Sequence, residues 1–474
     1  MLFNSLIFTA FLPLVFITYW LIKPSWRNGF LLLASWYFYF SYNPWFLLLL
    51  IGTSGFDYWC ARQIDKQEEP KQKKLYLLLS LFSNLGVLFV FKYFVFFYNT
   101  GLELFFKAEC DFDEMLLHQL IIPAGLSFYT FQSLSYTIDV YRGKYKASDS
   151  WSDFMLFVSF FPHMVAGPIV RYKDLMPQFK VRHYFKTIDW EAFAKLTAWG
   201  YFKKMVIADN LGEIVTPVFK DVHAYSGSTL LLAGFLFVVQ VYCDFSGYSD
   251  IATGIAKLFK IDLTLNWRRP LFSKSLHEFW TRNHISITTW FRDYLYIGLG
   301  GNRVTYRRWL LNIFLVFLIS GLWHGANFTF VIWGAMHGLV YIAEILARRR
   351  FPNLRVPGLI GWIYLIGFHT LSLIAFRALT VQDSMHVYKS IFTHFNPGHM
   401  GAELLRLKDA FYILLCALLV VFLFVKETQE EFAFIPSNAR FTRYYLQPAF
   451  YILLVLGIFL LGNFKANTFI YFQF

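Results

Sequence analysis

The chain has 474 residues, of which 57% are hydrophobic and only 15% are charged, and its formal net charge is +13. This balance is too apolar for one soluble domain of this length and is typical of a polytopic membrane protein. The basic residues lie mostly in loops beside apolar stretches, without an aromatic and basic module of the nucleic-acid-binding kind. The positive charge therefore indicates membrane topology and contact with lipid headgroups, and it excludes nucleic acid as the expected partner.

Apolar stretches that approach the ~20 residues needed to cross a bilayer recur along the whole chain. Several are short or interrupted by Gly and Pro, and such segments persist at membrane depth only where protein or a water-filled cavity satisfies their backbone. We therefore expect an all-α fold with about 11 transmembrane helices plus re-entrant and amphipathic helices. The candidate spans are residues 5–22, 28–42, 44–60, 75–98, 119–140, 153–170, 190–208, 229–246, 309–330, 332–347, 358–378, 409–425 and 447–463.

We expect a single integral-membrane domain with N-terminal helices in 1–255, a catalytic core in 256–347 and C-terminal helices in 348–474. No Lys or Arg precedes Lys23, so the first apolar stretch lacks the basic start of a signal peptide and is expected to be an uncleaved span. Lys23 and Arg27 place the first loop in the cytoplasm by the positive-inside rule, and the N-terminus outside.

A strongly basic segment, 257–308, is the longest interruption of apolar sequence, and its charge places it on the cytoplasmic side. Within it, Ser275–Tyr296 predicts one amphipathic helix, with Glu278 three residues after Ser275 in a capping-box pattern. Gly298–Gly301 should end this helix. Its aromatic content favours a helix folded into the protein as the floor of a site, and a helix lying on the membrane surface is the alternative.

His324 stands between a tryptophan and a glycine in Ser320–Asn327, inside apolar sequence where an ionisable side chain is costly. Two interpretations are open: His324 is a core histidine whose ring is hydrogen-bonded to the backbone, or it is a functional residue. The presence of His284 in the basic segment favours the functional residue. Acyl transfer to a hydroxyl needs a base, and imidazole, with a pKa of about 6.5, suits that role. We predict His324 as the general base, with His284 holding the second substrate group or polarising the carbonyl. Asn327 would orient the ring or the substrate.

Two intramembrane or interfacial carboxylates, Asp244 and Asp250, are expected to form structural ion pairs with Arg268 or Arg269, and a catalytic role is the less favoured alternative. Cys243 beside them is expected to be a small packing residue in preference to a thioester carrier.

His337 would lie roughly 140° from His324 if residues 324–338 formed one helix, so the two could face one narrow cavity only if the helix breaks. We therefore expect His337 to be a structural or lining residue. The remaining histidines, His369 among them, have no supporting constellation in the sequence.

The four cysteines show no CxxC pair or metal-ligand spacing, so neither a zinc site nor a disulfide framework is expected. There is no G-x-S-x-G elbow, P-loop or dinucleotide-binding glycine fingerprint, and no permanently bound cofactor is expected. The lack of a convincing internal repeat weakens the alternative of a transporter or lipid-linked sugar flippase. A non-catalytic scaffold of a cell-envelope complex is a third alternative.

Six ordered motifs resemble the membrane-bound O-acyltransferase (MBOAT) superfamily, and most closely its bacterial alginate O-acetyltransferase group. The match extends from about residue 1 to 345 and is looser in the C-terminal third. One departure is Asn283, which stands where the family usually has a tryptophan before the first histidine. The motifs are Pro123–Tyr129, Phe161–Pro168, Asp244–Asp250, Trp290–Tyr294, Gly298–Arg303 and Trp323–Thr329.

The resemblance implies helices around a central tunnel in a bacterial inner membrane, with cytoplasmic acetyl-CoA as the acyl donor. It further implies that an extracytoplasmic acyl-accepting transferase of the same pathway receives the acetyl group for an exported polysaccharide such as alginate. Peptidoglycan or another exopolysaccharide is the alternative acceptor. His324 and His284 would be catalytic and would meet at one cavity near mid-membrane, open to both sides. The expected substrate-binding residues are Trp323, Asn327, Arg268, Arg269, Arg282 and Trp290.

Overall fold

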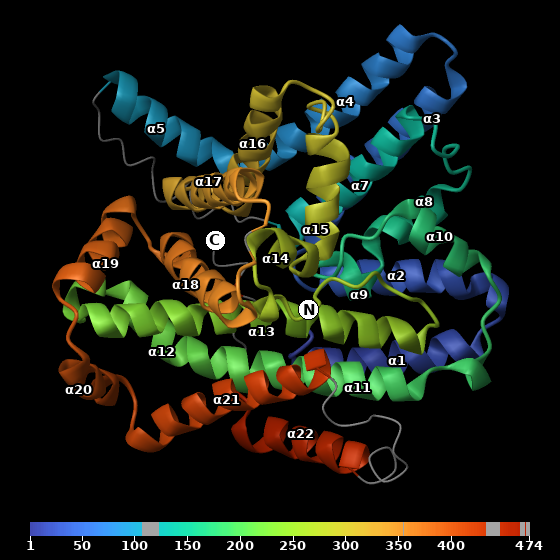
Figure 1. The fold of residues 1–474 in the computed structure, drawn as a ribbon. Coiled ribbons are helices and arrows are strands. Elements are labelled where there is room, and N and C mark those ends of the chain that lie inside the picture. Colours follow the sequence, from blue (N-terminus) through green and yellow to red (C-terminus); the bar gives the residue numbers. More distant parts are fainter. Residues whose placement is uncertain (107–122, 354, 433–445, 465–469, 471–474) are drawn as a thin grey trace. The chain divides into compact units, whose positions relative to one another are not determined.

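The computed structural model describes residues 1–106, 123–353, 355–432, 446–464 and 470. Every regular element in these ranges is a helix and none is a strand, which confirms the predicted all-α fold (Figure 1). Among them, five helices are long and apolar enough to cross a membrane. The figure of 11 spans and the outside N-terminus stay predictions. The five helices are Pro70–Gly101, Gly227–Leu258, Phe328–Arg350, Gly358–Arg377 and Ala410–Phe432.

The described residues fall into two compact units, and the division of the chain into three parts made from the sequence stays a prediction. The first unit comprises residues 1–194 and 252–264. In it, α3 packs against α4 and α7, and α2 packs against α8. Its helices are α1 (Leu6–Leu21), η1 (Pro24–Trp26), α2 (Arg27–Phe40), α3 (Pro44–Lys66), α4 (Pro70–Leu88), η2 (Phe89–Tyr93), α5 (Phe94–Phe106), α7 (Leu126–Tyr141), α8 (Trp151–Ser159), α9 (Phe161–Met164), α10 (Tyr172–Lys180) and η3 (Phe185–Thr187).

Polar groups join three helices of the first unit. The fully buried carboxylate of Asp57 on α3 accepts hydrogen bonds from Ser80 at 2.6 Å, from Asn84 at 2.7 and 2.9 Å, and from Ser133. A buried carboxylate is tolerated only when its oxygens are paired in this way. Asp57 therefore fixes α4 and α7 against α3.

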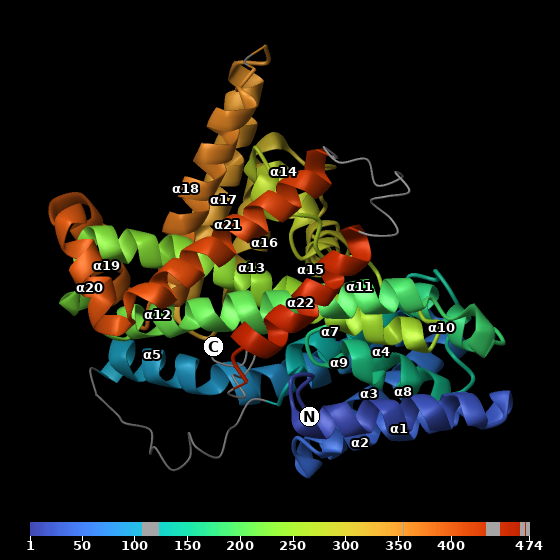
Figure 2. The same cartoon turned by 90° about the horizontal axis from the view of Figure 1, so that it is seen from below.

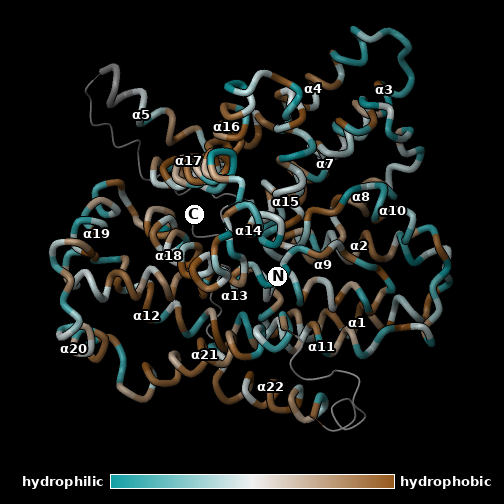
Figure 3. Tube along the Cα trace, in the orientation of Figure 1, coloured by the Kyte–Doolittle hydropathy of each residue, from teal (hydrophilic) through white to brown (hydrophobic). Residues whose placement is uncertain are grey.

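The second unit comprises residues 195–251 and 265–474, and α11 and α13 have residues in both units. Within it, α17 packs against α16 and α18, and α18 lies beside α17 in Figure 2. Apolar sequence follows α21 and α22 along most of their length (Figure 3). Its helices are α11 (Trp190–Tyr201), η4 (Phe202–Ala208), α12 (Asp209–Lys220), η5 (Val222–Ala224), α13 (Gly227–Leu258), η6 (Pro270–Phe272), α14 (Leu276–Arg282), α15 (Ile285–Trp290), η7 (Phe291–Tyr296), α16 (Tyr306–His324), α17 (Phe328–Arg350), α18 (Gly358–Arg377), α19 (Val381–Thr393), α20 (Pro397–Leu407), α21 (Ala410–Phe432) and α22 (Gln447–Leu461).

The hairpin of α16 and α17 is closed by two glycines. A Cβ atom at Gly321 would lie 2.3 Å from the carbonyl oxygen of Phe330, and one at Gly334 would lie 2.5 Å from that of Phe317. Both distances are shorter than real Cβ contacts, so only glycine permits this approach. Small residues serve the same purpose wherever transmembrane helices pack closely. The two glycines thereby set the spacing of the hairpin that ends in His324.

The prediction of one helix over Ser275–Tyr296 is wrong. His284 has φ 45° and ψ 52°, a left-handed conformation that ends one helix and begins another, so α14 and α15 are separate. The predicted capping box is half formed. Ser275 Oγ accepts from the Glu278 N–H at 3.2 Å, whereas the Glu278 carboxylate accepts from the Lys274 N–H at 2.9 Å.

The expected span over 309–330 is also divided. Helix α16 ends at His324, and Gly325 follows in an extended conformation with φ −160°. Asn327 then begins α17, because its side chain accepts the Thr329 N–H at 3.0 Å. A break at this position was the condition under which His324 and His337 could lie near each other. The rings of His324 and His337 both contact Trp333, at 5.0 and 4.5 Å between ring centroids.

Candidate active site

One cavity of about 730 Å³ lies within the second unit, and both His324 and His284 line it. Its walls come from α13 to α18, with the short helices α14, α15 and η7 along one side. The volume is in the range of small-molecule sites. The lining is mainly aromatic and aliphatic, with a few polar groups, as expected of a site that orients one substrate at a few fixed points.

The longest wall is one face of α16. The lining residues of this helix recur every three or four positions, which is the spacing of a single helical face. Fifteen residue steps separate Trp309 from His324, which corresponds to about 22 Å at 1.5 Å per residue. Helix α17, which packs against α16, contributes Trp333, Tyr341, Ile345 and Arg348 to the lining of the same cavity. We call this part of the cavity the α16–α17 groove.

His324 is the last residue of α16 and is half-buried at the glycine end of the hairpin. Its imidazole lies among three aromatic side chains, with ring centroids 4.8 Å from Trp323, 5.0 Å from Trp333 and 5.3 Å from Phe376. All three contacts are edge-to-face, with interplanar angles of 68°, 83° and 69°. Aromatic walls exclude water from the ring and hold it in one orientation. The end of α16 therefore presents a fixed imidazole to the cavity.

His284 is 3% exposed and joins α14 to α15. Its Nδ1 lies 3.2 Å from Asn266 Oδ1, which also accepts the Ser286 N–H at 3.1 Å. Because that oxygen can only accept, Nδ1 carries the proton and the lone pair is on Nε2. Burial lowers the pKa of His284 to about 3, so the ring is neutral at neutral pH.

The left-handed backbone of His284 costs of order 1–3 kcal/mol for a residue other than glycine. The ring stacks on Trp267 with centroids 5.7 Å apart and meets the edge of Phe245 at 4.7 Å. Strain of this kind persists where the surroundings fix the residue, and it clusters at functional sites. Packing and the Asn266 bond together hold this neutral imidazole in place.

The six expected substrate-binding residues do not line the cavity. Trp323 packs between His324 and Phe291, at 4.8 and 6.0 Å between ring centroids. Trp290 is 8% exposed and packs on Tyr294 at 5.1 Å.

Asn327 is engaged elsewhere, because besides capping α17 its Nδ2 donates to the carbonyl oxygen of Leu379 at 3.0 Å. The prediction that it orients the ring of His324 therefore has no support in its contacts. Among the arginines, Arg282 pairs with Glu431 at 2.7 Å, and Arg269 pairs with the same carboxylate at 2.9 Å. Arg268 is exposed. The substrate contacts of all six residues stay predictions.

The expected pairing of Asp244 and Asp250 with arginine is wrong. Asp244 pairs with Lys204 at 2.5 Å, and Asp250 pairs with Lys203 at 2.7 Å. The π-helix η4 carries both lysines into the interior, where they are 3% and 5% exposed. The two consecutive lysines resemble ordinary membrane-flanking charge in the sequence, so their burial could not be foreseen. Cys243 is fully buried in the hydrophobic core, which fits a packing role.

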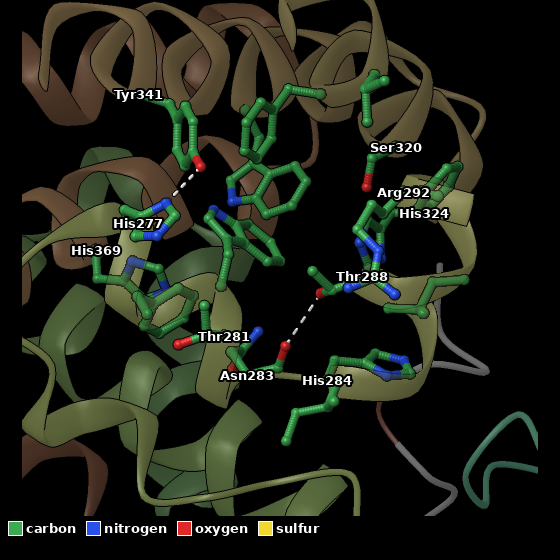
Figure 4. A pocket seen from close by; sticks show the side chains of 18 of the residues that line it. His277, Thr281, Asn283, His284, Thr288, Arg292, Ser320, His324, Tyr341 and His369 are labelled. Carbon is green, nitrogen blue, oxygen red and sulfur yellow. Dashed lines mark hydrogen bonds between the residues drawn. The ribbon is translucent and has the colours of Figure 1, made fainter. Parts of the chain in front are cut away.

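The sequence missed several polar groups that line the cavity. His369 on α18 and His277 on α14 both face it, and Figure 4 shows them with Tyr341 on one side of the view. His324, Ser320 and Arg292 lie on the other side of that view. His369 precedes Leu373 by four residues and Phe376 by seven, and all three line the cavity. That spacing was visible in the sequence, but nothing there indicated which helix the face would meet.

The family model described as MBOAT, membrane-bound O-acyltransferase family, matches residues 148–379. A probable alginate O-acetylase of Pseudomonas aeruginosa is 38% identical over 401 residues, which cover 83% of this chain and 75% of that protein. A peptidoglycan O-acetyltransferase of Helicobacter pylori is 35% identical over 428 residues, which cover 82% of this chain and 80% of that protein. A teichoic acid D-alanyltransferase of Bacillus subtilis is 28% identical over 240 residues, which cover 47% of this chain and 59% of that protein.

Proposed function

Because the chain belongs to the membrane-bound O-acyltransferase family, we propose that it moves an acetyl group from cytoplasmic acetyl-CoA across the bacterial inner membrane for O-acetylation of an exported cell-surface polysaccharide. Alginate is the acceptor polysaccharide that the relative from Pseudomonas aeruginosa suggests, and peptidoglycan is the one that the relative from Helicobacter pylori suggests. An extracytoplasmic transferase would receive the acetyl group from this protein. The observation that carries the proposal is that His324 and His284 line the same cavity.

The charge of the hairpin supports access of the donor from one end of the groove. Helix α17 ends with Arg348, Arg349 and Arg350, and α16 begins with Tyr306 followed by two arginines. By the positive-inside rule, these ends of the two helices lie on the cytoplasmic side. His324 lies at the other end of α16, about 24–27 Å further along the helix axis at 1.5 Å per residue. A donor that enters between the arginines would therefore reach His324 by passing along the α16–α17 groove.

In the proposed reaction, His324 takes the proton of the acceptor hydroxyl as its oxygen attacks the thioester carbonyl carbon. The C–O bond forms, the C–S bond breaks, and the proton passes from His324 to the departing sulfur, which leaves as the thiol of CoA. The lone pair on Nε2 of His284 suits acceptance of a hydrogen bond from the hydroxyl. That arrangement fits the holding role that we expected for His284 better than polarisation of the carbonyl, which would require a donor.

The proposal is tested by release of CoA from acetyl-CoA by the purified protein in proteoliposomes, with the extracytoplasmic transferase of the same pathway and alginate or peptidoglycan fragments supplied together as acceptor. His324→Ala should lower the rate by at least ~10²-fold, the smallest effect expected for a lost general base. His394→Ala is the matched control, since His394 is exposed and lies outside the cavity. Absence of CoA release from the wild-type protein, or more than a hundredth of the wild-type rate in the His324→Ala variant, would refute the proposal.

A further inference from the structure

A second groove is formed on the surface of the second unit between α18 and α21. It has a volume of about 570 Å³ and a mainly apolar lining, and all of its residues belong to that unit. Phe235 of α13 and Trp362 of α18 contribute to the lining. The rest is a single face of α21, on which the lining residues recur every four positions from Val420 to Gln429. We call this feature the α18–α21 groove.

The groove faces the hydrocarbon of the membrane. Helices α18 and α21 are both long and apolar enough to cross a membrane. Two lining residues of α21, Val421 and Val425, are 58% and 63% exposed. Leu418, about one turn earlier on the same face, is 57% exposed. Apolar side chains this exposed on a membrane helix contact lipid tails, because hydrocarbon surrounds the protein at that depth. A lipid acyl chain is therefore the ligand within reach of this groove.

One end of the groove is polar and lies on the cytoplasmic side. Helix α18 begins at Gly358, shortly after α17 ends in its three arginines, so the first turns of α18 are near the cytoplasmic surface. Trp362 is in these turns, and its indole N–H donates to a backbone carbonyl oxygen at 2.8 Å. Its ring lies 6.3 Å from that of Phe424, which is one turn before Thr428. Thr428 and Gln429 line this end of the groove, and neither side chain is hydrogen-bonded within the described residues.

Lys274 provides a cation at this end of the groove. A Cβ atom at Gly358 would lie 3.4 Å from the Lys274 ammonium, and Gly358 is one turn before Trp362, about 6 Å along the helix axis. Lys274 is exposed and forms no ion pair within the described part of the chain. The Glu278 carboxylate accepts the backbone N–H of Lys274 at 2.9 Å, but its ion pair is with Arg282 at 2.7 Å. The positive end of the α18 dipole adds to the attraction for an anion.

The carboxylates at the end of α21 do not oppose an anion at Lys274. Glu430 pairs with Lys426 at 2.8 Å, and Glu431 pairs with Arg269 at 2.9 Å. Their charges are therefore neutralised by neighbours, and the ammonium of Lys274 stays available.

We propose that the α18–α21 groove binds one anionic phospholipid of the cytoplasmic leaflet, with an acyl chain against α21 and the phosphate at Lys274. The apolar wall, the two polar side chains and the ammonium follow one another in the order of a phospholipid's chain, ester groups and phosphate. Basic residues at the cytoplasmic surface attract lipids of this charge. A soluble phosphate compound would use only the ammonium and leave the apolar groove empty. The bound lipid would brace residues 271–274, which lead into α14 and on to His284.

The test is titration of the detergent-purified protein with phosphatidylglycerol or phosphatidylcholine that carry the same acyl chains, with bound lipids counted by native mass spectrometry. The wild type should bind its first phosphatidylglycerol about fivefold more tightly than its first phosphatidylcholine, the effect of one lysine near a lipid phosphate. Lys274→Met should weaken the first phosphatidylglycerol about fivefold and leave phosphatidylcholine unchanged. Arg350→Met is the matched control and should change neither affinity, because Arg350 is an exposed cation at the cytoplasmic end of α17, outside the groove.

Val425→Trp should fill the groove and weaken the first lipid of either kind. Leu418→Trp should not, because Leu418 is similarly exposed on the same helix but does not line the groove. Both side chains point out of the protein, so both variants should fold like the wild type. Equal affinity of the wild type for the two lipids, or unchanged lipid binding in the Val425→Trp variant, would overturn the proposal. Competition by glycerol phosphate, which has no acyl chain, would also overturn it, because the groove would then play no part in binding.

Discussion

Replacing Gly334 with alanine should open the hairpin that carries His324. The added Cβ would lie 2.5 Å from the Phe317 carbonyl oxygen, and real Cβ atoms keep at least 3.0 Å, so α16 and α17 must separate by about 0.5 Å. A gap of that size forfeits about a quarter of the dispersion energy of each contact across it. Overpacking of this kind costs about 1–3 kcal/mol.

The same displacement should lower activity, because the hairpin sets the distance between His324 and the opposite wall of the cavity. A misplacement of 1 Å can reduce a rate about 10²-fold, so about tenfold is expected for half that shift. The assays are the midpoint of thermal unfolding in detergent and the rate of CoA release in proteoliposomes. Both should fall in the Gly334→Ala variant.

Gly367→Ala is the matched control for this prediction. Gly367 also lies within a long apolar helix, α18, and a Cβ there would meet nothing within 4 Å. Alanine is a better helix former than glycine by up to about 1 kcal/mol, so this variant should be as stable as the wild type or slightly more stable. If Gly334→Ala unfolds at the same temperature as Gly367→Ala and retains full activity, the close approach of the two helices does not position the site.

Three further outcomes follow from named contacts. Asn266→Ala should lower the rate of CoA release about tenfold without changing the KM for acetyl-CoA, because Asn266 fixes the tautomer of His284; an unchanged rate would refute that role. Burial lowers the pKa of His284 to about 3 from the usual 6.5, so as pH falls the unfolded chain binds a proton on this ring before the folded chain does. The free energy of unfolding should therefore fall between about pH 6.5 and pH 3, by up to about 1.4 kcal/mol per pH unit. His284→Gln should flatten this dependence in urea titrations at several pH values. Glu431→Gln should lower the free energy of unfolding by about 1 kcal/mol while the KM for acetyl-CoA stays within twofold, because the ion pairs of Glu431 with Arg269 and Arg282 are structural. A large rise in the KM would instead indicate that these arginines bind the donor phosphates.

Local features of the sequence were sufficient to predict the helical fold and to single out two histidines that the structure places in the lining of one cavity. The excess of apolar residues predicted membrane helices, and the isolation of His324 in apolar sequence made it a candidate functional group because burying an imidazole is costly. The regular spacing of lining residues on α16 is likewise a property of the sequence. These features depend only on residues within a few turns of one helix, so they can be recognised in the sequence without knowing how the helices pack.

Continuity of helices was harder to predict from the same information. The amphipathic pattern of 275–296 continues across His284, but one left-handed residue divides it, because the Asn266 side chain and the surrounding aromatic rings compensate for the strain. The break after His324 was foreseen only as a condition for bringing His337 near it. In both places a tertiary contact decided what the local pattern left open.

Only the tertiary structure decided which polar groups share the cavity and which charges pair. His369 had no partner in the sequence, yet packing of α18 against α14 brings it to the groove. Lys203 and Lys204 resembled flanking charge, and their burial opposite Asp250 and Asp244 came from the π-helix that turns them inward. Periodicity determines the face of a helix on which a residue lies, but the partner of that face is set by contacts between segments far apart in the chain, where the free energy depends on the fit of whole surfaces.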